Sequence, residues 1–150
     1  MTATPAPARE PAARARPLSE LLGLAEHRVS RLMEAVLAPA GLTLDQWRVL
    51  GLLADGAGHP MSEVAAHARV PAPTLTKIVD RLVDAALVYR RADEIDRRRV
   101  LVFLSEHGRV THERLAPRVA RIDEAIVGEL GTRDAARLGQ LLERLHALAG

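Results

Sequence analysis

The spacing of apolar residues changes its period twice along this 150-residue chain. Up to residue 85, apolar residues recur every three or four positions, as they do on one face of a helix. Residues 87–91 and 99–104 are short β-branched or aromatic runs with a period of two, and they flank the charged segment ADEIDRR. From residue 105 the helical spacing returns. The chain is therefore predicted to be mainly α, with a two-stranded hairpin between helices.

Four helices are predicted before the hairpin, at residues 18–38, 43–55, 62–68 and 72–85. Thr43 and Gln46 fit a capping box at the start of the second helix, and Ser62 is expected to cap the third. Ala72 precedes Pro73 and fits the N-cap position of the fourth, with Pro73 as its first residue. Apolar residues of the fourth helix recur without a gap at Leu75, Ile78, Val79, Leu82 and Val83.

The helices at the two ends of the chain carry broad apolar stripes. After residue 105 the stripe passes Pro117, which predicts a kink or a break, and Thr132 is expected to cap a last helix. That helix carries Leu138, Leu141, Leu142, Leu145 and Leu148. The small core between the ends cannot cover these stripes, so pairing of two chains is predicted; an intramolecular three-helix layer is the alternative.

The outward face of helix 72–85 is predicted to meet the major groove of DNA. Its exposed residues are predicted to be Thr74, Thr76, Lys77 and Arg81, with Ala72 and Pro73 at its N-terminus. Residues 69–99 hold eight basic and five acidic side chains, whereas the net charge of the whole chain is only +2. Codon bias is an alternative explanation for the high Arg count as a whole, but not for this concentration of charge.

The hairpin loop contains Asp96 followed by Arg97, Arg98 and Arg99. Arginine is favoured in narrow minor grooves, so these three side chains, with Arg90 on the first strand, are predicted to contact DNA. Asp96 is expected to pair with one of the arginines and to stabilise the loop. A solvated charged turn is the alternative interpretation.

Helices followed by a basic hairpin have the layout of a winged helix-turn-helix core, predicted for residues 42–108. Helices at 18–40 and 109–150 are the predicted dimerisation region, so residues 18–150 form one domain. Residues 1–17, rich in Ala, Pro and Arg, are predicted to be a disordered tail. Without a membrane-length apolar run or a signal-peptide core, the chain is expected to be cytoplasmic.

Two segments resemble the MarR (multiple antibiotic resistance regulator) family: PTLTKIVDRLVDAALVYR at 73–90 and DRRRVLVFLSEHG at 96–108. The resemblance covers about 18–148 and implies a homodimer that binds a pseudo-palindromic operator in double-stranded DNA, usually as a repressor, and leaves it when a small ligand binds. The family commonly has glycine where Ala86 stands. A left-handed backbone there would strain Ala86 by about 1 kcal/mol, unless the helix exits differently.

The resemblance also implies a ligand pocket between the dimerisation helices and the winged helix. The predicted contacts are His27, Arg31, Trp47 and Arg90, and the implied ligands are weak phenolic or aromatic acids. Other interpretations remain open: Trp47 as a core residue, Arg90 as a phosphate contact and His27 as a solvated edge residue.

Other functional classes find little support in the sequence. The chain has no cysteine, which excludes thiol-based redox sensing and thiolate metal sites, and its six histidines lack tight ligand spacing. We therefore expect no metal and no cofactor. No phosphate loop or nucleophile motif indicates an enzyme. A winged-helix module that binds other proteins, without DNA, is the alternative, but it would not need so basic a hairpin tip.

Overall fold

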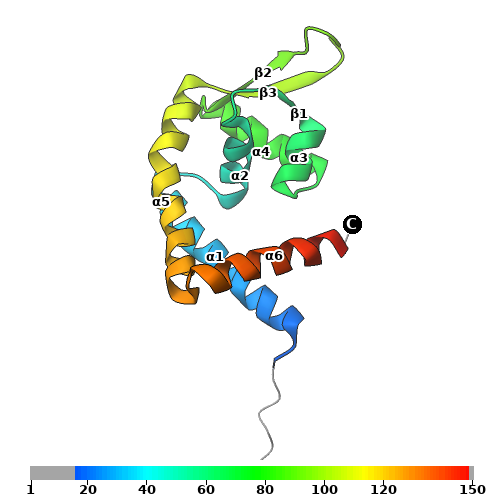
Figure 1. The fold of residues 1–150 in the computed structure, drawn as a ribbon. Coiled ribbons are helices and arrows are strands. Elements are labelled where there is room, and N and C mark those ends of the chain that lie inside the picture. The colour runs from blue at the N-terminus through cyan, green and yellow to red at the C-terminus, as the bar shows by residue number, and fades with distance from the viewer. Residues whose placement is uncertain (1–15, 149–150) are drawn as a thin grey trace, which may run out of the picture.

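A computed structural model describes residues 16–148 of the chain, and most of the predicted 1–17 tail lies outside the described residues. The elements are α1 (Leu18–Leu37), the short 3-10 helix η1 (Ala38–Ala40), α2 (Leu44–Leu53), β1 (His59–Pro60), α3 (Met61–Ala68), α4 (Ala72–Asp84), β2 (Val88–Ala92), β3 (Val100–Leu104), α5 (Glu106–Leu130) and α6 (Thr132–Leu148). Figure 1 shows α2 to β3 as one lobe, with α1, most of α5 and α6 extending below it.

The predicted fold class is confirmed, with one correction in the sheet. The sheet has three antiparallel strands in the order β1-β3-β2, not the two that were predicted. Val102 in the central strand lies between His59 on one side and Arg90 on the other. The extra strand is only two residues long, which is too short for any period to reveal it.

The core lies where α2, α3, α4 and the sheet meet. Leu50, Leu53, Val64, Leu82 and Val102 are fully buried there. In α4, the predicted stripe is buried at Leu75, Ile78, Val79 and Leu82, with Val83 half-buried beside it. Burial of this stripe fixes which side of α4 faces outward.

The predicted capping box of α2 and the start of α1 at Leu18 are confirmed, whereas the predicted N-caps of α3, α4 and α6 are wrong. Thr43 Oγ1 accepts from the Gln46 amide at 3.2 Å, and Gln46 Oε1 accepts from the Thr43 amide at 2.9 Å. Extended Pro60 and Pro71 occupy the N-cap positions of α3 and α4. Since each proline already sets the extended backbone that an N-cap needs, the N-cap of α3 lies two residues before the predicted Ser62, and that of α4 lies one residue before the predicted Ala72. Likewise, Ser62 and Ala72 lie inside α3 and α4, Pro73 is the second residue of α4, and Thr132 is the first residue of α6 rather than its cap.

Helix α5 continues through Pro117 without the break that was considered. Proline removes one backbone donor, which disfavours a helix interior by about 3 kcal/mol. Leu115 and Ile122, on either side of it, are buried. Their packing holds the two halves of α5 as one helix, which Figure 1 shows as a continuous ribbon.

The link from α4 to β2 passes through a strained residue. Ala86 has φ of 57°, in the left-handed region. The amide of Leu87 donates to Leu82 O at 2.9 Å, which closes the end of α4. Ser105 Oγ, at the N-cap of α5, donates to Ala86 O at 2.6 Å and accepts from the Gly108 amide at 2.9 Å. The exit of α4 is thus tied to the start of α5.

Replacing Ala86 with glycine is expected to raise the free energy of unfolding by about 0.5–1 kcal/mol, because glycine has no Cβ to strain at positive φ. Urea unfolding followed by circular dichroism measures this change. The matched control is Ala85→Gly, where φ is −81° and glycine should destabilise. Equal effects of the two substitutions would show that Ala86 is not strained.

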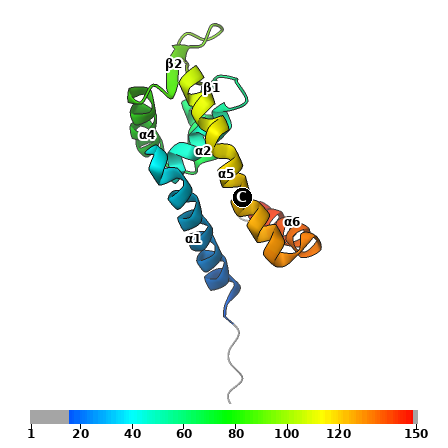
Figure 2. The ribbon, with the colours of Figure 1, turned by 90° about the vertical axis from the view of Figure 1, so that its left-hand side faces the viewer.

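The helices outside the core have few partners within the chain. Figure 1 shows α6 crossing in front of α1, but Figure 2 shows the two helices apart, with α6 at the far end of α5. No residue of α6 is buried. Between residues 16 and 148, no helix has both the length and the apolar character required to cross a membrane.

Candidate nucleic-acid interface

The outward face of α4 is polar and open to solvent. The six residues predicted to meet DNA from this helix are all exposed: Ala72, Pro73, Thr74, Thr76, Lys77 and Arg81. Thr76 Oγ1 donates to Ala72 O at 3.1 Å, so its lone pairs are left to accept from a ligand. The first intrahelical bond runs from the Leu75 amide to Pro71 O, which leaves the earlier amides of Ala72 and Thr74 at the helix N-terminus.

The hairpin loop between β2 and β3 is held by its own hydrogen bonds. The Asp93 amide donates to Arg99 O, and the Arg99 amide donates to Asp96 O, both at 2.9 Å. Asp96 Oδ1 accepts from the backbone amide of Arg98 at 3.1 Å. Asp96 therefore stabilises the loop, but through this amide; in the described residues it forms no ion pair with an arginine, contrary to the expectation. The three exposed arginine side chains, at 97–99, remain available.

An ion pair connects the hairpin to α4. Arg90 Nη2 on β2 lies 2.6 Å from Asp80 Oδ1 on α4. Both side chains are partly exposed, so the pair contributes at most about 1 kcal/mol to stability. The pair nevertheless links the hairpin to the outward face of α4. Arg90 was predicted as a DNA or ligand contact; within the described residues its side chain lies in this partly exposed pair, and both contacts stay predictions.

Aromatic packing stiffens the base of the hairpin. Phe103 on β3 stacks on Tyr89 of β2, with ring centroids 5.3 Å apart. The Arg91 guanidinium lies 4.7 Å from the Phe103 ring centroid. Behind this ring, Gly58 has no room for a Cβ. The basic loop therefore extends from a packed base.

A buried histidine clamps the segment between α2 and α3, and the sequence alone did not reveal it. His59 is 8% exposed. Its Nε2 lies 2.8 Å from Asp55 Oδ2, and its Nδ1 lies 3.1 Å from Glu63 Oε1. Burial on its own would lower the pKa of His59, but the hydrogen bonds to Asp55 and Glu63 outweigh it and raise that pKa.

The stability of the protein is expected to depend on pH through His59. Because its pKa is raised in the folded state, its contribution is complete below the unfolded pKa of about 6.5 and is lost as pH rises through the folded pKa. Chemical unfolding at about pH 6 and pH 8 should show that the free energy of unfolding falls more between these pH values in the wild type than in His59→Gln. His112 has the opposite effect on the pH dependence of stability, because burial lowers its pKa despite the nearby Glu113. Since both the wild type and His59→Gln contain His112, its effect cancels in the comparison. Equal losses would contradict the clamp.

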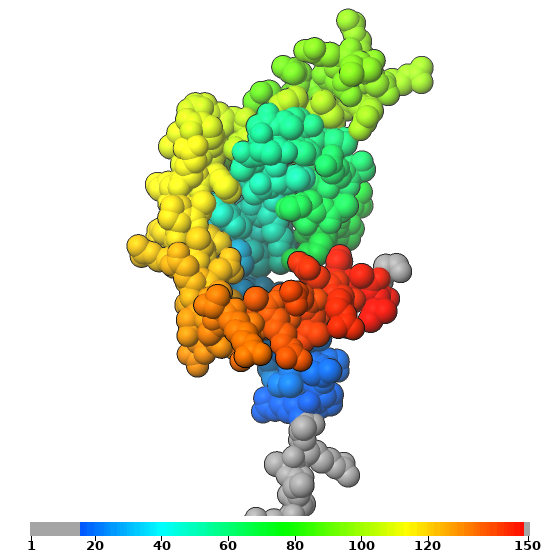
Figure 3. Space-filling model, viewed as in Figure 1, coloured from blue at the N-terminus to red at the C-terminus, as the bar shows by residue number. Residues whose placement is uncertain are grey.

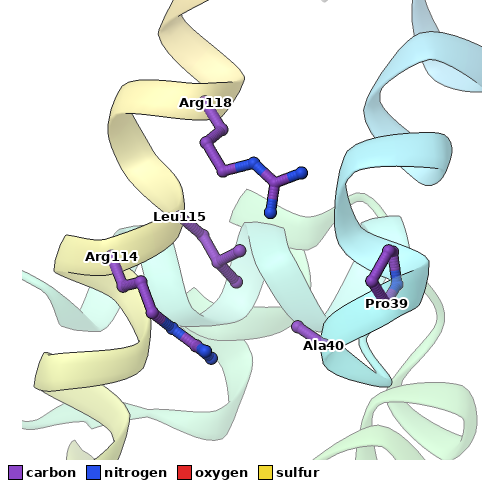
Figure 4. Close-up of a pocket in the computed structure, with 5 residues that line it drawn as sticks. All are labelled: Pro39, Ala40, Arg114, Leu115 and Arg118. Atoms are coloured by element: carbon purple, nitrogen blue, oxygen red, sulfur yellow. The ribbon is translucent and has the colours of Figure 1, made fainter.

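A small cavity lies between η1 and α5. It has a volume of about 90 Å³ and is lined by Pro39, Ala40, Arg114, Leu115 and Arg118. Figure 4 shows the Arg118 side chain reaching from α5 toward Pro39, with Arg114 one turn away on the same helix. Within residues 16–148 neither arginine forms an ion pair. The i, i+4 spacing of Arg114 and Arg118 is the signal in the sequence that places both charges on one side of α5.

None of the predicted ligand contacts lines this cavity. Trp47 is 8% exposed and stacks on His112 of α5, with ring centroids 4.7 Å apart, so it is a core residue. His27 and Arg31 are exposed on α1. The cavity instead draws its charged groups from α5.

Comparisons with known proteins agree with this geometry. The sequence profile of the MarR family matches residues 40–99. The HTH-type transcriptional regulator FarR of Neisseria gonorrhoeae is 32% identical over 126 residues, 83% of this chain and 86% of the relative. The structure of NadR in complex with 4-hydroxyphenylacetate has 29% identity and a TM-score of 0.75, over 91% of this chain and 96% of that one. The structure of the transcriptional repressor CouR bound to a 23-mer DNA duplex has 30% identity and a TM-score of 0.75. The match covers 89% of this chain and 93% of that chain.

Proposed function

The chain belongs to the MarR family of DNA-binding transcriptional regulators, and we propose that it is a homodimeric repressor that a small acid releases from a pseudo-palindromic operator. The observation that carries the proposal is that α4, whose outward face is polar and exposed, contacts strand β2 of the arginine-rich hairpin. The ion pair between Arg90 and Asp80 joins them. In this arrangement α4 enters the major groove and Arg97–Arg99 reach the adjacent minor groove. CouR, a relative of similar fold, is known bound to a DNA duplex.

Dimerisation is supported by leucines that the single chain leaves uncovered. On α1 these are Leu18, Leu21, Leu22, Leu24 and Leu32. On α6 they are Leu138, Leu141, Leu142, Leu145 and Leu148. An intramolecular helical layer would have buried part of the α6 stripe, and no residue of α6 is buried. Pairing two chains through α1, α5 and α6 buries both sets and spaces two α4 helices for successive major grooves.

The cavity beside α5 supports an anionic ligand. Two like charges four residues apart on a helix repel each other, and a carboxylate between them removes that cost. The apolar floor of Leu115 and Pro39 suits the carbon atoms next to such a group. A cavity of about 90 Å³ holds the acid group and leaves the rest of the ligand outside it. NadR, a relative, is known in complex with the aromatic acid 4-hydroxyphenylacetate.

The Arg118→Ala variant is expected to need at least about tenfold more acid for release from DNA, since a charged hydrogen bond contributes about 1.5–3 kcal/mol. Fluorescence anisotropy with 4-hydroxyphenylacetate and salicylate as probes measures the release. DNA affinity without ligand should stay unchanged. Arg121→Ala, an exposed arginine of α5 that does not line the cavity, is the matched control. If both variants respond like the wild type, Arg118 does not hold the ligand.

The DNA-binding part of the proposal is tested by the salt dependence of binding to DNA from upstream of the protein's own gene. Neutralising about 6–10 phosphates gives a slope of roughly −5 to −9 in a plot of log affinity against log salt. A flat plot, or no binding, would favour a winged-helix module that contacts proteins instead.

A further inference from the structure

The loop of the hairpin exposes an isoleucine almost completely. Ile95 is 97% exposed, more than any other large apolar side chain in residues 16–148. Most of the other exposed large apolar residues lie on α1, on α6 and at the C-terminal end of α5 (Val127 and Leu130), where the proposed dimer covers them. Figure 3 shows the hairpin projecting clear of the rest of the chain, at the opposite end from α6 and α1. Dimerisation through those helices therefore leaves Ile95 in solvent.

The backbone around Ile95 is held by hydrogen bonds within the loop. Its amide donates to Asp93 Oδ1 at 2.9 Å. The loop is closed on either side by the bonds of Asp93 to Arg99 and of Asp96 to Arg98. A side chain on such a loop is presented in a restricted set of directions, so its burial against a partner costs little further backbone entropy.

Ile95 contributes no packing to the fold, and an apolar side chain gains free energy only when it leaves water. Arg97, Arg98 and Arg99 follow it in the same loop. Any partner that these arginines bind therefore comes within reach of Ile95. A loop that enters a minor groove meets deoxyribose C–H groups along the groove walls, and apolar side chains such as isoleucine are known to insert between base steps from this groove.

We propose that Ile95 is a minor-groove contact that adds apolar, salt-independent affinity beside the electrostatic contacts of the arginines. The inference rests on the proposed function, since it requires the hairpin to bind DNA. It assigns the two components of hairpin binding to different side chains: the arginines neutralise phosphates or the groove potential, and Ile95 removes apolar surface from water.

The test separates these components by their salt dependence. Wild type, Ile95→Ala, Ile95→Leu and Arg98→Ala are titrated with upstream DNA at several salt concentrations. Ile95→Ala is expected to bind about three- to tenfold more weakly, with an unchanged slope of log affinity against log salt. Ile95→Leu should retain most of the affinity. Arg98→Ala should reduce the slope by about two, because each chain of the proposed dimer loses one phosphate contact.

Val110→Ala, which truncates a half-exposed side chain on α5, controls for the loss of any exposed apolar residue and should bind like the wild type. Wild-type affinity in Ile95→Ala, with Arg98→Ala weakened, would overturn this inference and leave the proposed function standing. A changed slope in Ile95→Ala would also overturn it. Absence of salt-dependent binding by the wild type would overturn the proposed function and this inference with it.

Discussion

Replacing Gly108 with alanine is expected to lower the free energy of unfolding by about 3 kcal/mol, the upper range for overpacking. Gly108 lies in the first turn of α5, where an added Cβ would overlap Leu87 O and come within 2.7 Å of Leu104 Cδ1. The carbonyl of Leu87 cannot move aside easily, because it accepts a hydrogen bond from the Ser105 amide at 3.0 Å. The close approach of α5 to the exit of α4 therefore requires glycine.

Gly128 provides the matched control on the same helix. A Cβ there meets nothing within 4 Å. Gly128→Ala should therefore stabilise the helix by up to about 1 kcal/mol, the propensity difference between the two residues. Urea unfolding of both variants gives the comparison. If the two substitutions shift stability in the same direction, the junction between α4, β2 and α5 is looser than described.

The Leu142→Glu variant is expected to be monomeric and to bind operator DNA about a hundredfold more weakly or worse, because two linked α4 helices gain avidity that one lacks. Leu142 is 41% exposed in the apolar stripe of α6. A charge there would be buried in the proposed dimer at a cost of several kcal/mol. Since no residue of α6 is buried within the chain, the monomer should stay folded.

Gln140→Glu introduces the same side chain two positions earlier on α6, away from the leucine stripe. It should remain dimeric and bind DNA like the wild type. Light scattering coupled to size exclusion gives the mass of each variant, circular dichroism its fold and anisotropy its affinity. A dimeric Leu142→Glu would show that α6 does not form the interface.

The parts of the fold that the sequence predicted are those with a readable period. In α4, Leu75, Ile78 and Leu82 are buried because a 3.6-residue period places them on one face. That burial fixes the opposite face, so the exposed residues Lys77 and Arg81 could be assigned without a structure. The helix boundaries were predicted less accurately. Pro60 and Pro71 are the N-caps of α3 and α4, but in the sequence alone a proline can equally be the last residue of an extended segment.

The features that sequence reasoning missed depend on tertiary contacts. Strand β1 exists only because β3 lies beside it. The carboxylates on either side of His59 are spaced four residues from it, but this segment is not one continuous helix, so the spacing alone predicted no contact. The cavity near Arg118 forms only where η1 approaches α5. The sequence left open whether Trp47 is a core residue or a ligand contact, because its stack on His112 joins residues far apart in the chain.

A hydroxyl-radical footprint on DNA from upstream of the protein's own gene, with a measurement of binding stoichiometry, tests whether a dimer binds an operator. Two protected half-sites about 10 base pairs apart, bound by two chains, are expected. Leu142→Glu should lose this protection, and Gln140→Glu should keep it. One protected half-site bound by a single chain, or equal protection of unrelated DNA, would contradict a dimeric operator-binding protein.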